Sequence, residues 1–397
     1  MSKTARYVMF AILYFAQGAV LSYFTALNSL YLLSFDLTMS QIGLVGTVGL
    51  IPMVLKIFLG MLSDQVNLLH IGHRKPYIIL GLLLQAACLL IAPLINPGLQ
   101  YGLFVALAFM LMSGMALYDS ATDGLALDTT PKEEEGAIQG FMVGGRALGV
   151  VLISGVIGLL VERTSWTMAF TLLAVLSLLP LPLVLRVKEA ERRAEQKFEW
   201  KAFGAFKAWP LIALALLGAL YSLVINGANQ IVNPFLQARF NISISTAGLV
   251  TTVWGLGVVA GSLAGGRLTD RWGHHRSALR AMLFSFASIL LLAFTAQGWM
   301  VWVLVAFFGI AYGFYETVYF AVSMDRTDPR IAASMFAILM AVANLGTGVG
   351  LGLSGSLVDA IGFSNTFIIL ALLNLIALPL LPAIFKKPVP ARVSIEP

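Results

Sequence analysis

The sequence predicts an all-α membrane protein of twelve transmembrane helices, arranged as two pseudo-symmetric six-helix bundles. Three observations support this prediction. Of the 397 residues, 59% are hydrophobic and only 11% are charged, whereas about 25% of residues are charged in a typical soluble domain. Twelve apolar runs are long enough to cross a bilayer, and the second half of the chain repeats features of the first. This composition excludes a soluble fold and a nucleic-acid-binding protein, despite the formal net charge of +6.

The twelve spans are predicted from the length and composition of apolar runs in the chain. A helix needs about 20 mainly apolar residues to cross the hydrocarbon core, and the alternating pattern of a membrane β-barrel is absent. The first run is too long and too polar for a cleaved signal peptide, so we count it as a span. The predicted spans are 7–33, 42–62, 76–96, 99–127, 137–160, 166–186, 210–236, 246–265, 277–297, 299–323, 331–358 and 363–385.

The distribution of basic residues predicts the orientation. Lys56 and Arg146 lie inside spans, and Arg163 and Arg239 lie in odd-numbered loops. The other Lys and Arg residues lie at the termini or in even-numbered loops. Because cytoplasmic loops carry the excess of basic residues, we expect both termini on the cytoplasmic side of a cell (inner) membrane.

A charged segment divides the spans six and six. We expect residues 1–186 to form an N-terminal bundle, 187–209 a cytoplasmic linker without chemistry of its own, and 210–397 a C-terminal bundle. Such repeats are typical of secondary transporters, whose bundles rock about a central site; duplication that serves packing alone is the alternative. The matching stretches are Phe35–Ser40 with Phe240–Ser245, Gly43–Val45 with Gly248–Val250, and Gly60–Asp64 with Gly266–Asp270.

The loop Gly266–Arg276 resembles the cytoplasmic signature of the major facilitator superfamily, which joins the second and third helices of each bundle. In the first half Gly60 and Asp64 match, but the basic cluster arrives about five residues late, at Arg74. The resemblance implies the major facilitator fold and a gate at the cytoplasmic face, which an Asp held by Arg and by a helix N-terminus would close. The gating candidates are Gly60, Asp64, Arg74, Gly266, Asp270, Arg271 and Arg276.

Three further stretches narrow the resemblance. Lys56–Asp64, Asp119–Asp128 and Gly145–Gly149 look like the branch that holds muropeptide permeases, acetyl-CoA transporters and certain siderophore importers. Folate–biopterin carriers share part of this pattern. The resemblance implies a solute transporter, often driven by protons, and favours import.

Four charged residues of the first bundle lie inside the predicted membrane region: Lys56, Asp119, Asp123 and Arg146. Intramembrane charges are costly and usually face a cavity or a partner. We expect the four to neutralise one another, with Asp119 and Asp123 as proton candidates and Lys56 or Arg146 as the contact for an anionic group. The alternative is an ion-pair network that only holds the fold together.

Glu316 is the single intramembrane charge predicted for the second bundle, where no Lys or Arg is available to pair with it. Burial without a partner disfavours the charged carboxylate, so Glu316 is the main candidate for a proton carrier. Its neighbours Tyr312, Tyr315 and Tyr319 complete a stripe on the tenth span. The alternative is a protonated Glu that is bonded to a tyrosine and has no role in transport.

The seventh span carries four amides at helical spacing, and the first span carries a looser version of the same pattern. A polar face of this kind is costly toward lipid and should line water or another helix. The resemblance implies that helices one, four, seven and ten line the central cavity; a polar seam between helices is the alternative. The residues are Asn226, Asn229, Gln230 and Asn233 in the seventh span, and Tyr14, Gln17, Thr25 and Asn28 in the first.

Together these features predict a secondary active transporter that moves a small polar or anionic solute by alternating access, coupled to protons. We expect a monomer in the lipid bilayer, with no nucleic-acid partner, no metal and no cofactor apart from the proton gradient. No nucleophile–base pair or phosphate-binding loop indicates an enzyme. Two alternatives remain: a drug or metabolite efflux antiporter, and a non-transporting factor that delivers or assembles pigment or lipid.

Overall fold

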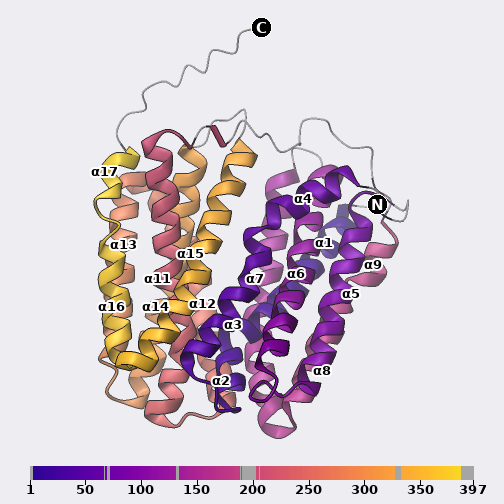
Figure 1. The fold of residues 1–397 in the computed structure, drawn as a ribbon. Helices are drawn as coiled ribbons and strands as arrows, with labels where there is room; N and C mark the ends of the chain where they lie inside the picture. Colours follow the sequence, from indigo (N-terminus) through magenta and orange to yellow (C-terminus); the bar gives the residue numbers. More distant parts are fainter. Residues whose placement is uncertain are drawn as a thin grey trace.

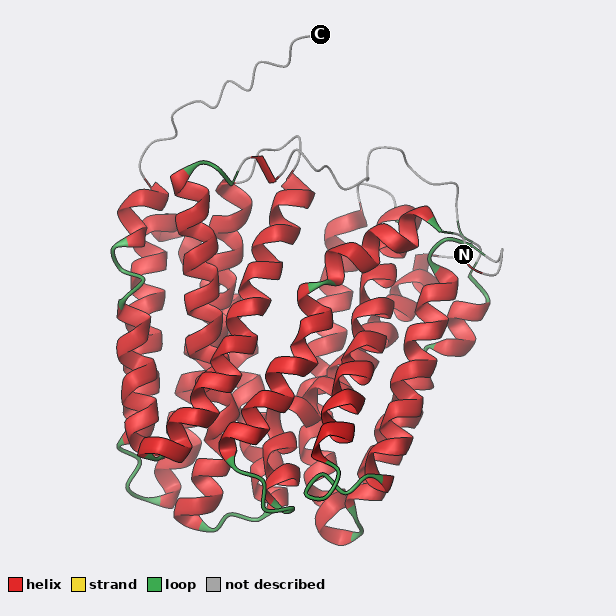
Figure 2. Ribbon diagram, in the orientation of Figure 1, coloured by secondary structure: helices red, strands yellow, loops and turns green. Residues whose placement is uncertain are grey.

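The computed structural model describes residues 3–66, 68, 72–130, 134–187, 189, 203–204, 206–326 and 332–385. Within these ranges the regular elements are all helical and short loops join them (Figure 2). The first group of helices is α1 (Lys3–Ser22), η1 (Tyr23–Leu27), α2 (Asn28–Leu33), α3 (Met39–Val54), α4 (Lys56–Gln65), α5 (Lys75–Ile91), η3 (Ala92–Leu94), α6 (Tyr101–Thr129), α7 (Glu135–Arg163), α8 (Trp166–Leu178) and α9 (Leu181–Leu185). The second is α11 (Trp209–Phe240), α12 (Ile244–Trp272), α13 (His274–Ala293), α14 (Gly298–Arg326), α15 (Ala332–Ile361), α16 (Phe363–Leu375) and α17 (Leu380–Phe385).

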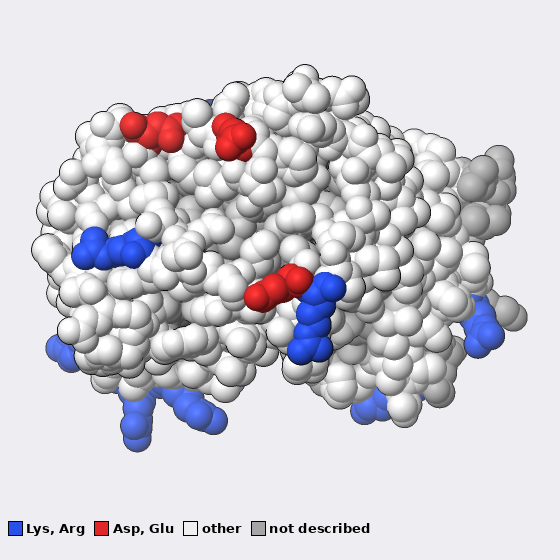
Figure 3. All heavy atoms as spheres, turned by 90° about the horizontal axis from the view of Figure 1, so that it is seen from below, with Lys and Arg blue, Asp and Glu red and all other residues white. Residues whose placement is uncertain are grey.

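The two groups of helices stand side by side as two bundles (Figure 1). The chain enters α1 and leaves α17 at the same end of the molecule, which we call the terminal face; the other end is the opposite face (Figure 1). The bundles meet mainly where α3 packs on α15 and where α7 packs on α12. Charged side chains are sparse over the opposite face (Figure 3).

Each of the twelve predicted spans corresponds to one helix or to two or three consecutive helical segments. Among the described residues, eleven helical segments are long and apolar enough to cross a membrane. The remaining span, predicted at 42–62, is broken into α3 and α4 at Leu55. Pro52 lies in the last turn of α3 and lacks the backbone N–H that would continue the hydrogen-bond ladder. The break places Lys56 at the first position of α4.

The start of the second helix of each bundle follows from the repeated sequence. Thr38 caps α3 by accepting a hydrogen bond from the Gln41 backbone N–H, and the Gln41 side chain bonds back to Thr38 in a capping box. In the second bundle, Ser243 caps α12 by accepting from the Thr246 N–H. A hydroxyl residue, Thr38 or Ser243, therefore caps the equivalent helix in each repeat.

The first span contains a departure from regular α-helix that its sequence does not predict. Residues Tyr23–Leu27 form the π-helical turn η1 between α1 and α2. Thr25 lies in this turn, and its hydroxyl donates a hydrogen bond to the Leu21 carbonyl at 2.9 Å. Turns of this kind occur often at functional sites.

Candidate functional site

Three helices of the first bundle hold a cluster of charged and polar side chains. Lys56 of α4 forms ion pairs with Asp119 and Asp123 of α6, and its Nζ lies 3.1 Å from Asp123 Oδ2. From α1, the Tyr14 hydroxyl donates to Asp123, and Gln17 Nε2 donates to Asp119 Oδ1 at 2.8 Å. The structure therefore brings together these five residues, which the sequence analysis selected from three separate spans.

The break between α3 and α4 positions Lys56 for these contacts. The Ser120 hydroxyl on α6 donates to the Lys56 carbonyl at 3.2 Å and so occupies a backbone acceptor beside the break. The side chains of Lys56 and Asp123 are 34% and 35% exposed, whereas that of Asp119 is 7% exposed. Asp119 is thus the buried anchor of the cluster, and Lys56 and Asp123 are its accessible part.

Arg146 of α7 and Glu316 of α14 carry opposite charges and interact electrostatically from different bundles. Glu316 is the carboxylate whose charge acts most strongly on Arg146, ahead of Asp119 and Asp123. In turn, Arg146 is the cation that acts on Glu316. Within the described part of the chain, the two side chains make no hydrogen bond and no ion pair within 4.0 Å with each other. They attract each other across the bundle interface without closing into contact.

Close packing of α7 on α1 fixes the backbone of Arg146. Gly18 of α1 lies directly against the Arg146 carbonyl, and a side chain at position 18 would collide with it. On α7, Gly145 and Gly149 lie against the Ala11 and Phe15 carbonyls in the same way. These glycines let the helix backbones approach closely and hold Arg146 beside the cluster of Lys56.

The second bundle presents an aromatic and amide surface next to Glu316. Tyr312, one turn before Glu316, donates its hydroxyl to Asn226 Oδ1 at 3.0 Å. Asn226 Nδ2 in turn donates to the Thr347 hydroxyl at 3.2 Å. The Trp254 ring of α12 meets Tyr312 edge to face, with ring centroids 5.1 Å apart. These contacts join α11, α12, α14 and α15 around Glu316.

Most of the predicted amide face serves as a seam between helices. Gln230 Nε2 donates to the Leu351 carbonyl at 3.0 Å and lies 3.3 Å from the Ser354 hydroxyl of α15. Asn233 Nδ2 donates to the Thr251 hydroxyl of α12 at 3.1 Å. The alternative of a polar helix seam therefore describes these two residues, and Asn226 combines a seam contact with its bond from Tyr312.

Asn229 and Asn233 both line a small, partly open cavity between the bundles. Thr25 of η1 contributes the first-bundle side of this cavity, and Trp254 lies on the second-bundle side. Trp254 is buried, and its indole N–H has no hydrogen-bond partner among the described residues. The sequence analysis did not select Trp254; its position on the helix that faces α7 is the signal that would have identified it.

The other two tyrosines of the predicted stripe belong to the interior of the second bundle. Tyr315 and Tyr319 are each 1% exposed. Both pack on Tyr221 of α11, with centroid distances of 4.6 and 5.5 Å. Gly218 leaves room for the Tyr319 hydroxyl, which a side chain at that position would strike. Tyr312 and Glu316 therefore face the bundle interface, while Tyr315 and Tyr319 hold α11 on α14.

The gating candidates of the first bundle centre on Arg74. Its Nε lies 3.2 Å from Asp128 Oδ2, and its Nη1 donates to the Ser63 hydroxyl at 2.7 Å. Gly60 lies one turn before Ser63 on α4. A Cβ placed on Gly60 would lie 4.0 Å from the Ser120 side chain. The side chain of Asp64, the predicted partner of the basic cluster, lies outside the described residues.

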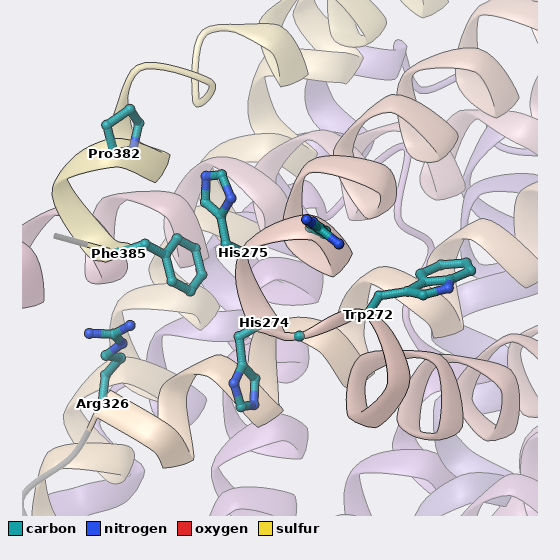
Figure 4. Close-up of a pocket in the computed structure, with 8 residues that line it drawn as sticks. Trp272, His274, His275, Arg326, Pro382 and Phe385 are labelled. Carbon is teal, nitrogen blue, oxygen red and sulfur yellow. The ribbon is translucent and has the colours of Figure 1, made fainter. Parts of the chain in front are cut away.

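The gating candidates of the second bundle lie at the terminal face. Asp270, Arg271 and Arg276 are exposed, and Gly266 is half-buried within α12. Arg276 lines an open pocket of about 560 Å³, in which His275 faces Phe385 at a centroid distance of 5.0 Å (Figure 4). The other lining residues are Trp272, Gly273, His274, Arg326 and Pro382.

Comparison with known proteins places this geometry in a family context. The family model described as Major Facilitator Superfamily matches residues 10–228 and 214–397. The anhydromuropeptide permease of Escherichia coli K12 is 24% identical over 383 residues, which cover 91% of this chain and 76% of the permease. The crystal structure of the nucleoside transporter NupG superposes with a TM-score of 0.82 at 16% identity, covering 98% of this chain and 100% of that one. An inward-facing bacterial homologue of the human lysosomal transporter Spinster gives a TM-score of 0.76 at 16% identity, covering 96% and 97%.

Proposed function

The chain belongs to the major facilitator superfamily, and on that premise we propose that it imports a small solute with an anionic group by proton-coupled alternating access. It is a multi-pass membrane transporter, and its relatives and structural neighbours are transporters rather than enzymes. The excess of basic residues at the termini and in even-numbered loops supports a cytoplasmic terminal face. Solute would then enter from the opposite face and leave at the terminal face.

The observation that carries the proposal is the separation of Arg146 from Glu316. An anionic group of the solute would bind the Arg146 guanidinium, because arginine presents several donors in a fork that fits a carboxylate or phosphate. Glu316 would then share its counter-charge, the Arg146 guanidinium, with the solute. It would take up a proton in the same step, since a buried carboxylate with a weakened counter-charge favours its neutral form.

Among the described residues, few other ionisable groups act on Glu316. Arg146 of α7 faces it from the first bundle, and Tyr312 and Tyr221 interact with it from α14 and α11. Neither tyrosine supplies a positive charge, so binding at Arg146 controls the charge state of Glu316. Release of the anionic group toward the terminal face would return Arg146 to Glu316 and expel the proton. One proton would therefore accompany each anionic group bound at Arg146.

The two walls of the site suggest the class of solute. The first bundle offers Lys56 and Arg146 to an anionic group, and the second offers the Tyr312 and Asn226 pair and Trp254 to a neutral polar part. A solute with a carboxylate and neutral hydrogen-bonding groups fits both walls. The E. coli relative is named an anhydromuropeptide permease, so we propose muropeptides as the first solutes to test.

The test is uptake into proteoliposomes with and without an inward proton gradient. The parent protein should accumulate an anhydromuropeptide only with the gradient. Glu316→Gln should abolish accumulation but retain exchange of labelled for unlabelled solute, because the site is still present when the carboxyl is permanently neutral. Arg146→Gln should lose both activities, and Asp36→Asn, which neutralises an exposed loop carboxylate, should behave as the parent. Accumulation by Glu316→Gln with unchanged pH dependence would rule out the proton role.

A further inference from the structure

The two crossings between the bundles on the opposite-face side are built from the same contacts, once in each half of the chain. One crossing joins α3 to α15, and the other joins α12 to α7. At the outer end of the first, the Asp359 carboxylate of α15 accepts hydrogen bonds from the backbone N–H groups of Met39 and Ser40 at 3.0 and 2.6 Å, and from the Ser40 hydroxyl at 2.5 Å. These donors form the N-terminus of α3.

The second crossing repeats this arrangement with the bundles exchanged. Glu162, near the end of α7, accepts a hydrogen bond from the Ser245 backbone N–H at 3.2 Å. Ser245 lies in the first turn of α12, as Ser40 lies in the first turn of α3. In both crossings a carboxylate from one bundle binds the N-terminus of a helix in the other. A negative charge is favourable at that position because the helix dipole and free N–H groups point toward it.

A second level of contacts, next along the helices, brings the backbones together at glycines. A side chain at Gly43 or Gly355 would collide with α15 or α3, respectively. In the other crossing, a Cβ on Gly158 would come within 2.8 Å of the Ile244 carbonyl, and one on Gly248 within 2.5 Å of the Ser154 carbonyl. The hydrogen bonds of the first level and the glycine contacts of the second both require the helices to touch. Both crossings are therefore closed in this structure.

A third level consists of one threonine in each crossing. The Thr47 hydroxyl donates to the Gly348 carbonyl at 2.7 Å, and the Thr252 hydroxyl donates to the Val151 carbonyl at 2.9 Å. The three levels use the same residue spacing in both halves of the chain. Ser40, Gly43 and Thr47 of α3 correspond to Ser245, Gly248 and Thr252 of α12; Gly348, Gly355 and Asp359 of α15 correspond to Val151, Gly158 and Glu162 of α7.

We propose that Asp359 and Glu162 are the latches of the gate at the opposite face, and that this gate opens only when their bonds to α3 and α12 break. The inference rests on the alternating-access function proposed above. Among the contacts of the three levels, these are the charged ones, and they lie at the outer ends of the crossings, where rocking separates the bundles most. Asp359 accepts three hydrogen bonds and Glu162 accepts one, so Asp359 is the stronger latch.

The test measures access of a water-soluble thiol reagent to a cysteine behind the latches. Cys88 is the one cysteine of the chain and is buried, so Cys88→Ala supplies the background. Val250→Cys places the reporter in the small cavity between the bundles, where the native side chain is 1% exposed. Asp359→Asn should raise the labelling rate of this reporter by about fivefold and Glu162→Gln by about twofold. Asp36→Asn is the matched control, because it removes an exposed carboxylate from the loop before α3 and should leave the rate unchanged.

A second reporter separates gate opening from general loosening. Ile57→Cys lies on the terminal-face side of the same interface, where Ile57 packs against Met335 and Ile338. If the gates alternate, Asp359→Asn should lower labelling at this position while it raises labelling at Val250→Cys. An increase at both reporters, or a rate for Asp359→Asn equal to that of Asp36→Asn, would overturn the latch.

The latch and the transport proposal fail in different ways. Labelling requires neither a solute nor a proton gradient, so the predicted change in Asp359→Asn can appear in a protein that accumulates no muropeptide. That result would support the latch and would exclude muropeptides as the transported solute. Proton-driven uptake combined with unchanged labelling in Asp359→Asn would do the reverse.

Discussion

Arg74 and Asp128 form an ion pair that is almost completely buried near the terminal face of the first bundle: Arg74 Nε lies 3.2 Å from Asp128 Oδ2, and the side chains are 6% and 9% exposed. The sequence analysis placed Arg74 in the cytoplasmic gate but did not select Asp128, although both lie in the stretches that carry the family resemblance. The pair joins the start of α5 to the end of α6 and so holds these two helix ends together beside the predicted gate.

Removing one member of this pair should destabilise the protein strongly. Arg74→Met leaves Asp128 as a buried charge without its partner, which costs about 3 kcal/mol or more. Thermal unfolding in detergent should show the loss, and Arg74→Met/Asp128→Leu should recover a large part of it because the buried Asp128 charge is then removed as well. An Arg74→Met protein as stable as the parent would contradict this assignment.

Variants of the cluster around Lys56 should distinguish an effect on stability from an effect on transport. Lys56→Met leaves Asp119 buried and unneutralised, so it should lower both the melting temperature and uptake. Lys56→Met/Asp119→Asn should restore the melting temperature but not uptake, if Lys56 contacts the solute. Recovery of both properties in the double variant would support the alternative of a purely structural ion-pair network.

A disulfide across the second crossing should stop transport reversibly. The Ser154 and Thr252 hydroxyl oxygens lie 3.0 Å apart on α7 and α12, so cysteines at these positions are close enough to bond. In the Cys88→Ala background, oxidised Ser154→Cys/Thr252→Cys should show no uptake, and a reductant should restore it. The single cysteine variants, oxidised in parallel, serve as controls. Undiminished uptake by a fully cross-linked protein would exclude rocking at this crossing.

Glu189 should couple the linker to the first bundle. Its carboxylate accepts hydrogen bonds from the backbone N–H groups of His73, Arg74 and Lys75 at 2.6, 2.9 and 2.5 Å, at the start of α5. Because loss of a helix cap costs about 1 kcal/mol, Glu189→Ala should lower the melting temperature measurably. Glu189→Gln, which retains acceptor atoms, should lower it less. Equal stability of Glu189→Ala and the parent would show that the cap is dispensable.

Glu134 should make the terminal face more stable at neutral than at acid pH. Desolvation raises the pKa of this carboxyl, but hydrogen bonds from Lys3 and Arg6 and the charge of Lys3 outweigh it and hold the pKa below its usual value. A carboxyl with a lowered folded-state pKa stabilises the protein above its unfolded pKa, and this stabilisation is lost as the pH falls through the folded-state pKa. Glu134→Gln should therefore melt below the parent at neutral pH and together with it in acid. A difference that persists in acid would point to packing instead of charge.

The sequence predicted the helices far better than their mutual orientation. Apolar length alone located all twelve spans, because a bilayer sets the length of a helix that crosses it. The cost of intramembrane charges also led the sequence analysis to group Lys56 with Asp119 and Asp123, which are paired in the structure. The break at Leu55 lies three residues after Pro52, and because the apolar run continues through it, length did not reveal it.

The sequence alone did not predict which residues meet across the interface between the bundles. The sequence analysis grouped Arg146 with the first-bundle charges and assigned no cation to Glu316; in the structure Arg146 interacts electrostatically with Glu316 as well as with Asp119 and Asp123. Helical spacing gives the face on which a residue lies, but not the rotation of that face toward a helix of the other bundle. For the same reason, the spacing of Gln230 and Asn233 identified a polar face but not that it packs on α15 and α12.

The π-helical turn η1 determines the direction in which the side chains after it point along the first span. It takes up one residue more than an α-helical turn, and one residue of a regular helix corresponds to a rotation of roughly 100°. The residues of α2 consequently face directions that α1 alone would not give them. Ser29 of α2 donates its hydroxyl to the Gln230 carbonyl of the other bundle at 3.4 Å. Loss of a single residue within Tyr23–Leu27 would turn η1 into a regular α-helical turn and keep Ser29 facing this partner, whereas loss of a residue from α1 would rotate Ser29 by roughly 100° relative to the start of the span. The interface should therefore tolerate a one-residue deletion within η1 better than one within α1.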